Sequence, residues 1–250
     1  SCHMTFPLFK YLNCFIKKKL KDDKTLEKEL IKYKKVLTDK NLPIIFTLEH
    51  LCLVSSFSIS DARNICKSNR IHFYKRFKLR KRRGGYRLIQ TPTNNLKYLQ
   101  RWILIHILNN VPSHKYSFGF DKKSSIKKNA EIHINAEAIL KMDLMRFYDS
   151  INERRIYGIF KELGYHTNLA VSFAKILTVT PDNYFFKTFK KNESSLKAYL
   201  KSLENELLEK QGIITQGSPS SPKLANLVCR SLDNRLDKLS KKYDLKYSRY

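Results

Sequence analysis

The stretch from Ile139 to Asp149 holds residue types that a cation-assisted reaction needs. An apolar run leads to Asp143, and an aromatic pair, Phe147 and Tyr148, separates this acid from Asp149. The run predicts a buried strand, and a carboxylate at the mouth of such a strand is placed to hold a hard cation such as Mg²⁺. A solvated Asp at an ordinary strand end is the simpler interpretation of this stretch alone. The choice between the two depends on residues elsewhere in the chain.

The densest charge in the chain lies between Lys75 and Arg87, where eight of thirteen residues are Lys or Arg and none is acidic. Apolar residues alternate with these cations, and Gly84-Gly85 is a strong two-residue turn signal. The pattern predicts a β-hairpin with a basic tip and one basic face. Because Arg offers a bidentate fork and Lys a point charge, such a hairpin is suited to bind the phosphates of a nucleotide or a strand. A localisation signal or a solvated tip is the alternative.

A turn-forming loop, Gln216-Gly217-Ser218-Pro219, precedes a helix in which a Ser cap is followed by Pro222 at the first position. Leucines at helical spacing extend this helix to Leu239. His133 is a further residue that could bind a metal or transfer a proton. A lone His more often bonds a backbone carbonyl, and we prefer that interpretation.

Helices are expected to position most of these residues. Periodic apolar residues and caps predict helices at 6–40 with a basic face, within 42–59, from Ser60-Asp61 to Cys66, at 96–108 with Trp102 packed beside the apolar stripe, from Asn152 to a stop at Gly164, and at 169–177. Residues 181–210 predict an inserted loop and helix, and residues 245–250 alternate like a strand.

The bulk composition narrows the class of partner. The chain has 250 residues, 42% of them hydrophobic, enough for one large or two modest domains. Forty-nine Lys and Arg against 22 Asp and Glu give a formal net charge of +27, which favours a polyanion, and nucleic acid over a membrane. No secretory leader is recognised, and five scattered Cys fit a reducing compartment. We therefore expect a cytoplasmic protein without a membrane partner.

Three stretches, by their residues and their order along the chain, resemble the reverse transcriptases of bacteria, most closely the retron type. The resemblance covers roughly Phe73 to Tyr250. The matching motifs are Lys141-Met142-Asp143 with Phe147-Tyr148, Gln216-Gly217-Ser218-Pro219 with Ser221-Pro222, and Arg87 with the cations before it. Two further motifs resemble an insertion typical of retron enzymes: Ser117-x-Gly119-Phe120 and Asn129-Ala130-x-x-His133.

The resemblance implies a role for each matching residue. Asp143 would be the catalytic acid that ligates two Mg²⁺ ions, with Mn²⁺ as an alternative, and the Leu144 backbone carbonyl would add a ligand. Tyr148 would be the gate that excludes a 2′-hydroxyl, and Gln216 and Gly217 would line the nucleotide and template. The other implied contacts are to the triphosphate, from Arg87, Arg80 and Lys81, and to nucleic acid, from Lys78, Arg82, Arg83, Asn129 and His133.

Two departures from the family's pattern carry expectations of their own. Ile214-Thr215 stands where the family usually has Leu-Pro, after the inserted segment 181–210, which leaves open a related defence-type enzyme. The family's pattern continues beyond the Tyr that matches Tyr250 with Ala-Asp-Asp, the other metal-binding acids, and then a thumb. Because one Asp cannot supply two octahedral Mg²⁺ sites, this chain is expected to be catalytically incomplete.

The implied fold is α+β, a right-hand polymerase with an antiparallel palm sheet: an N-terminal helical region at 1–70, fingers at 71–135 and an incomplete palm at 136–250, the thumb being absent. The implied function is an RNA-directed DNA polymerase that copies a structured noncoding RNA into DNA from deoxynucleotides. Priming from an RNA 2′-hydroxyl, antiphage defence and an effector or toxin partner are further implications. A non-catalytic RNA-binding scaffold and another defence reverse transcriptase remain alternatives, and a metal-dependent nuclease is disfavoured because no further acids cluster near Asp143 in sequence.

Overall fold

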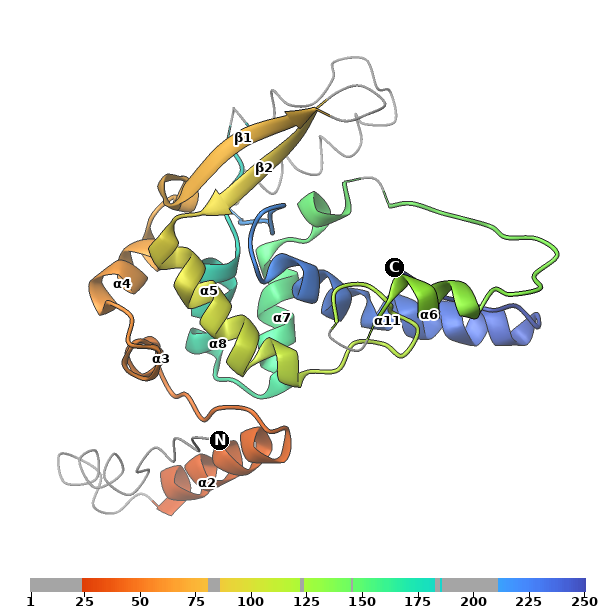
Figure 1. Ribbon diagram of the computed structural model, residues 1–250. Helices are drawn as coiled ribbons and strands as arrows, with labels where there is room; N and C mark the ends of the chain where they lie inside the picture. Colours follow the sequence, from red (N-terminus) through yellow and green to blue (C-terminus); the bar gives the residue numbers. More distant parts are fainter. Residues whose placement is uncertain (1–23, 81–85, 122–123, 145, 183–184, 186–210) are drawn as a thin grey trace.

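The computed structural model describes residues 24–80, 86–121, 124–144, 146–182, 185 and 211–250, in which a set of helices carries one β-hairpin (Figure 1). In chain order the elements are α2 (Lys24–Asp39), α3 (Leu48–Ser55), α4 (Ile59–Lys67), η1 (Arg70–Phe73), β1 (Tyr74–Arg80), β2 (Tyr86–Pro92), α5 (Asn94–His106), η2 (Leu108–Asn110), α6 (Ile126–Glu131), η3 (Phe147–Ser150), α7 (Glu153–Leu163), α8 (Thr167–Leu177) and α11 (Ser221–Lys242).

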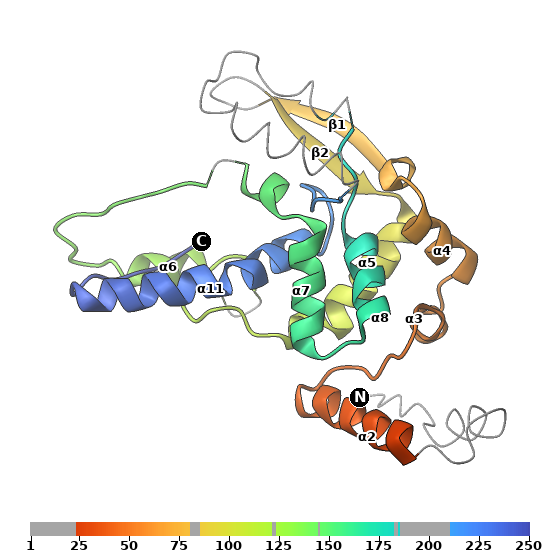
Figure 2. The same cartoon turned by 180° about the vertical axis from the view of Figure 1, so that it is seen from behind.

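The core lies among α5, α7 and α8; α7 packs against α8, and α5 runs obliquely across them (Figures 1 and 2). Each helix has an apolar face at helical spacing, and these faces pack together. The buried residues include Leu99 and Ile103 of α5, Phe160 of α7 and Phe173 of α8. The rings of Phe160 and Phe173 stack with their centroids 4.4 Å apart. Trp102 is half-buried and packs against this core, as the sequence predicts. The three helices therefore form a packed base for the segments that carry the predicted site residues.

The predicted hairpin is confirmed in its strands. β1 and β2 pair antiparallel, from Tyr74 opposite Pro92 to Arg80 opposite Tyr86. They form the one sheet within the described ranges. The tip with Gly84-Gly85 lies outside the described residues.

Local capping signals predict several helix ends correctly. The Asn152 side chain accepts a hydrogen bond from the Arg155 backbone N–H at 3.2 Å, and Gly164 ends α7 in the left-handed region with φ +110°. The predicted cap at Ser60-Asp61 is wrong by two positions. Ser58 is the cap, because its hydroxyl accepts a hydrogen bond from the Asp61 backbone N–H.

The two N-terminal predictions need correction in extent. Of the predicted helix at 6–40, Lys24–Asp39 is helical and buries Tyr33 and Leu37, while residues 6–23 lie outside the described ranges. Within 42–59 only Leu48–Ser55 is one helix, because Ser56 takes a left-handed conformation that ends it. No described helix has the length and apolar character needed to cross a membrane.

The expected palm strand into Asp143 is not formed by the described residues. Ile139, Leu140 and Met142 belong to no helix or strand and are 68%, 83% and 74% exposed, and no described strand pairs with them. Residues 245–250 likewise form one bridge, between Ser117 and Arg249, in place of a full strand. A strand stays regular only when a neighbour satisfies its backbone groups. The helices and the small antiparallel sheet agree with an α+β polymerase fold, while the division at 70 and 135 stays a prediction.

Candidate active site

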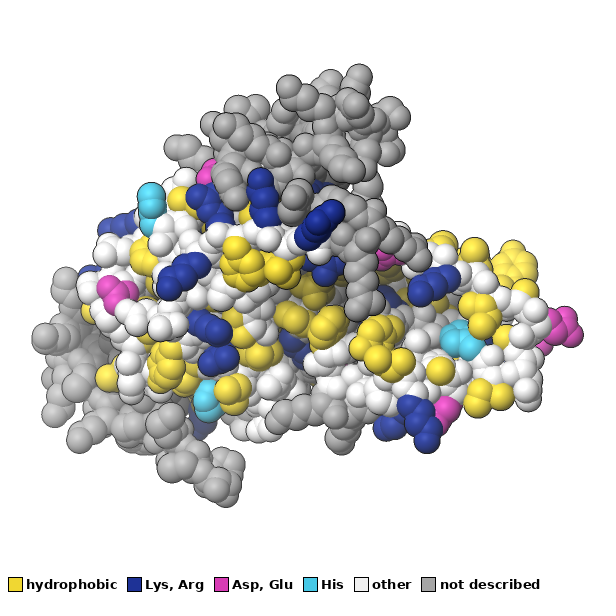
Figure 3. Space-filling model, turned by 45° about the horizontal axis from the view of Figure 1, so that its top comes forward, with side chains coloured by type: hydrophobic (Ala, Val, Ile, Leu, Met, Phe, Trp, Pro, Cys, Tyr) yellow, Lys and Arg dark blue, Asp and Glu magenta, His cyan; other side chains and the backbone are white. Residues whose placement is uncertain are grey.

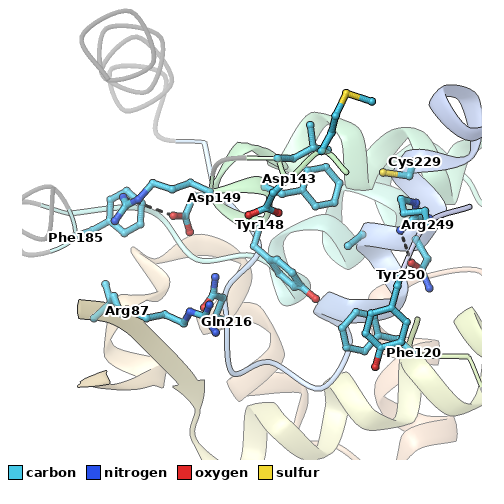
Figure 4. A pocket seen from close by; sticks show the side chains of 17 residues that line it. Arg87, Phe120, Asp143, Tyr148, Asp149, Phe185, Gln216, Cys229, Arg249 and Tyr250 are labelled. Atoms are coloured by element: carbon cyan, nitrogen blue, oxygen red, sulfur yellow. Dashed lines mark hydrogen bonds and ion pairs between the residues drawn. The ribbon is translucent and has the colours of Figure 1, made fainter. Parts of the chain in front are cut away.

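A pocket of about 430 Å³ gathers residues from segments that are far apart in the sequence (Figure 4). The pocket is open to solvent near Asp143, which is an exposed residue. Its lining comes from β2, the loop before α6, the segment around η3, the loop before α11, α11 itself and the last residues: Arg87, Leu88, Phe120, Met142, Asp143, Leu144, Arg146, Phe147, Tyr148, Asp149, Phe185, Gln216, Ala225, Asn226, Cys229, Arg249 and Tyr250.

The structure brings together most of the predicted catalytic and nucleotide-binding residues. Asp143, Leu144, Tyr148, Gln216 and Arg87 all line this one pocket. An adjoining pocket of about 360 Å³ shares the last three of these and adds a sixth predicted residue, the glycine at position 217. In Figure 4 the Asp143 and Tyr148 side chains lie between Arg87 and Gln216 on one side and the C-terminal residues on the other.

Other predicted residues do not line either pocket. Lys78 and Arg80 are exposed on β1, and Lys81, Arg82 and Arg83 lie outside the described residues. Asn129 belongs to α6 and its backbone N–H donates to the Ser125 carbonyl. We expected His133 to bond a backbone carbonyl, and this prediction is wrong. Its Nε2 lies 2.6 Å from the Ser248 hydroxyl instead. His133 therefore joins the segment after α6 to the last residues of the chain.

Asp143 and Asp149 differ in their surroundings. The Asp143 carboxylate makes no hydrogen bond or ion pair with any described residue. Asp149 lies 3.7 Å from Nη1 of Arg146, whose guanidinium also lies over the Phe185 ring (Figure 4). Asp143 is therefore the pocket carboxylate that can accept a cation without breaking an existing ion pair with a described residue.

The donors present fit only part of a two-ion centre. Within the described ranges, no group of three His, Cys, Asp or Glu side chains is arranged to hold a metal. Asp143 offers a hard carboxylate, and Leu144 lines the same pocket. One carboxylate suits part of the ligand shell of a hard cation and does not by itself hold two ions.

The Gln216 loop is fixed to β2 by backbone and hydroxyl contacts. The Gln90 backbone N–H donates to the Gln216 carbonyl at 2.8 Å, and the Thr215 hydroxyl donates to the Gln90 carbonyl at 3.0 Å. Gly217 has φ +126°, and a Cβ there would lie 2.7 Å from the Gln90 carbonyl oxygen. Glycine is needed at this position because both the backbone angle and the space exclude a side chain.

Sequence reasoning missed Asp233, the residue that holds the last residues in place. This fully buried acid on α11 accepts hydrogen bonds from Arg249 Nε at 2.9 Å, from Arg249 Nη2 at 3.0 Å and from the Tyr247 hydroxyl at 2.7 Å. Arg249 also donates to the Asn226 side chain at 2.9 Å and to the Ser117 hydroxyl at 3.0 Å. An acid on the buried stripe of the helix, one turn after Cys229, was the available signal.

Burial raises the pKa of the pocket phenol and thiol and so favours their neutral forms. Burial raises the pKa of Tyr148, an effect that the positive charge of Arg249 reduces. Burial also raises the pKa of the Cys229 thiol. For Arg249, burial lowers the pKa, but the hydrogen bonds and charge of Asp233 outweigh it, so the net pKa is raised. The pocket therefore has a permanent cation at Arg249 that is already neutralised by Asp233.

With this geometry in place, comparison with known families identifies the chain. Residues 79–250, more than half of it, match the family described as reverse transcriptase (RNA-dependent DNA polymerase). The chain belongs to the reverse transcriptase family.

Its curated relatives are retron reverse transcriptases. It is 29% identical over 216 residues to the Retron Ec86 reverse transcriptase of Escherichia coli, across 86% of this chain and 58% of the relative. It is also 29% identical over 222 residues to the Retron Mx65 reverse transcriptase of Myxococcus xanthus, across 84% and 47%. The chain is thus of retron type, as its motifs suggest, and it spans about half the length of the curated relatives it matches.

Proposed function

We propose that the protein is an RNA-directed DNA polymerase that extends a primer on an RNA template with deoxynucleotides. The observation that carries the proposal is the pocket in which Asp143, Tyr148, Gln216 and Arg87 meet, in a chain of the reverse transcriptase family. Nucleotidyl transfer joins a primer hydroxyl to the α-phosphate of the nucleotide and releases pyrophosphate.

Each pocket residue has a task in this reaction. The exposed Arg87 guanidinium would hold the triphosphate by charge and paired hydrogen bonds. The Tyr148 ring would occupy the space that a ribose 2′-hydroxyl needs, and Gln216 would contact the nucleotide beside β2. Asp143 and the Leu144 carbonyl would bind a divalent ion, Mg²⁺ or Mn²⁺, which when bound neutralises charge on the phosphates.

A structured RNA is the proposed template and the DNA copy its product. The formal net charge is +27, and the face in Figure 3 shows Lys and Arg side chains spread over it with few Asp or Glu among them. Such a surface attracts a phosphate backbone. By resemblance to the retron reverse transcriptases, the proposal extends to a noncoding RNA as template, to antiphage defence and to an effector protein.

The test is primer extension by the protein produced with its full natural sequence. A DNA product that requires deoxynucleotides, a divalent ion and the RNA template supports the proposal. RNA binding without synthesis would contradict it and favour a non-catalytic RNA-binding module. The non-catalytic RNA-binding module remains the second candidate because the described residues contain no cluster of three metal-binding side chains.

A further inference from the structure

Phe120 combines two properties that a structural residue rarely has. The backbone of Phe120 is in the left-handed region with φ +64°, where a residue with a bulky side chain is strained. Phe120 is also 67% exposed. The strain therefore is not balanced by burial of the ring. Backbone strain of this kind persists where the surrounding structure enforces it, and such positions cluster at ligand-binding sites.

The chain after Phe120 is anchored by a buried lysine. Asp121 Oδ1 accepts a hydrogen bond from Lys223 Nζ at 2.6 Å, and Lys223 is 5% exposed on α11. The Ser124 hydroxyl donates to the Asp121 carbonyl at 2.6 Å. These contacts fix the position at which the chain leaves the strained residue.

The chain before Phe120 is anchored to α11 and to the end of the chain. The Gly119 carbonyl accepts a hydrogen bond from the buried Asn226 side chain at 2.7 Å. The Phe118 backbone N–H donates to the Arg249 carbonyl at 2.7 Å. Gly119 packs so closely that a Cβ would lie 3.3 Å from the Tyr250 carbonyl carbon. The backbone on both sides of Phe120 is therefore held in place, while the ring itself is exposed.

That place is the junction of the two pockets. Phe120 lines the pocket that contains Asp143 and also the adjoining pocket that contains Gly217. Three other residues also line both pockets: Arg87, Tyr148 and Gln216. No described aromatic ring stacks on Phe120. An exposed ring in a pocket that also holds an arginine combines the two features by which proteins bind single-stranded nucleic acid, an aromatic face for a base and a cation for the backbone.

We propose that Phe120 is a stacking platform for a nucleobase at the active site, an inference that rests on the proposed polymerase function. The base belongs either to the template or to the incoming deoxynucleotide, and both present the same π-face. Stacking on aromatic side chains is sequence-tolerant, so the platform positions a base without selecting it.

The variant that separates stacking from folding is Phe120→Asn. Asn tolerates the left-handed backbone and removes the ring, so the Tm is expected to stay unchanged or to rise by about 2–4 °C. Binding of an RNA template–primer or the KM for the deoxynucleotide is expected to worsen by about fivefold to a hundredfold, the range that one stacked base contributes. Phe120→Trp retains a ring and is expected to restore most of the loss.

Template–primers with one abasic position identify the base. If the base is the template's, an abasic site at one position weakens binding by wild type and does not weaken Phe120→Asn further. If it is the nucleotide's, the loss is in KM and abasic substitution acts equally on both proteins. Tyr243→Asn is the matched control, because Tyr243 is 60% exposed and lines neither pocket.

Unchanged affinity and KM in Phe120→Asn would overturn the stacking role, as would a fall in Tm of more than about 4 °C, the shift expected if the ring were structural. Failure of the proposed function has a different outcome, which is that wild type makes no DNA. Equilibrium binding of the template–primer, and of the deoxynucleotide to that complex, still tests the stacking in that case.

Discussion

Asp233→Asn is the substitution that tests how the pocket is held together. The Asp233 carboxylate is fully buried and receives two hydrogen bonds from the Arg249 guanidinium and one from the Tyr247 hydroxyl. Asn keeps the size of the side chain but removes the negative charge, and it replaces one acceptor oxygen by an amide donor that faces the guanidinium. The variant leaves a largely buried cation without its counter-charge.

The expected cost follows from these contacts. Removing one partner of a buried ion pair destabilises a protein by about 3–5 kcal/mol. The Arg249 side chain is 20% exposed, so water compensates in part and the lower end, about 3 kcal/mol, applies. For a domain of this size that free energy corresponds to a fall in Tm of about 6–12 °C. Because Arg249 and Tyr250 line the pocket, DNA synthesis should also fall at temperatures well below that Tm.

A double-mutant cycle separates the contribution of the Asp233–Arg249 ion pair from the other effects of each substitution. Arg249→Met in the Asp233→Asn background removes the stranded charge, so much of the lost stability should return, although synthesis should not. Glu49→Gln is the control, since Glu49 forms an exposed ion pair with Arg63 at 3.0 Å and should change the Tm little. An Asp233→Asn protein with the Tm of wild type, or additive effects in the cycle, would refute the reasoning.

Three further perturbations address the loop, the gate and a buried imidazole. Gly217→Ala should unfold the loop and abolish synthesis because its Cβ would meet the Gln90 carbonyl, whereas Gly158→Ala, with open space around it, should raise stability by about 0.5–1 kcal/mol in thermal unfolding. Tyr148→Ala should raise the ratio of ribonucleotide to deoxynucleotide incorporation, and an unchanged ratio would remove its role as gate. Burial lowers the pKa of His50 in the folded protein, so as pH falls this imidazole is protonated in the unfolded chain before it is protonated in the folded one. The contribution of neutral His50 to the free energy of unfolding is therefore complete above about pH 6.5 and is lost as pH falls toward and through the folded-state pKa. Thermal unfolding between pH 7 and 5 should show this loss in wild type and less of it in His50→Gln.

Features that depend on neighbouring residues in the sequence were predicted well. The hairpin strands follow from alternation, and the ends of α7 follow from a capping Asn152 and a left-handed Gly164. The convergence of Asp143 with the Gln216 loop and Arg87 was predicted through the family resemblance, since no local rule brings residues so distant in sequence together.

Features that depend on partners distant in sequence were missed. The apolar run before Asp143 has the composition of a buried strand, but burial requires a paired neighbour, and among the described residues none is present. Asp233 looks like an ordinary charged residue of a long helix until Arg249 is placed against it. The left-handed conformation of Phe120 arises from anchors on α11, which residue propensity does not encode.

The most direct measurement of the central claim is the rate of RNA-directed DNA synthesis by Asp143→Asn beside Asp244→Asn, both in the full natural sequence. Asp143 is exposed and makes no hydrogen bond or ion pair with described residues, so its substitution should leave the Tm unchanged. Asp244 is also exposed and has φ +53°, a backbone that Asn tolerates, and it lines neither pocket. We predict that Asp143→Asn loses synthesis by at least about a hundredfold, about 2.7 kcal/mol of transition-state stabilisation, while Asp244→Asn retains it. Wild-type synthesis by Asp143→Asn would contradict the assignment of the active site.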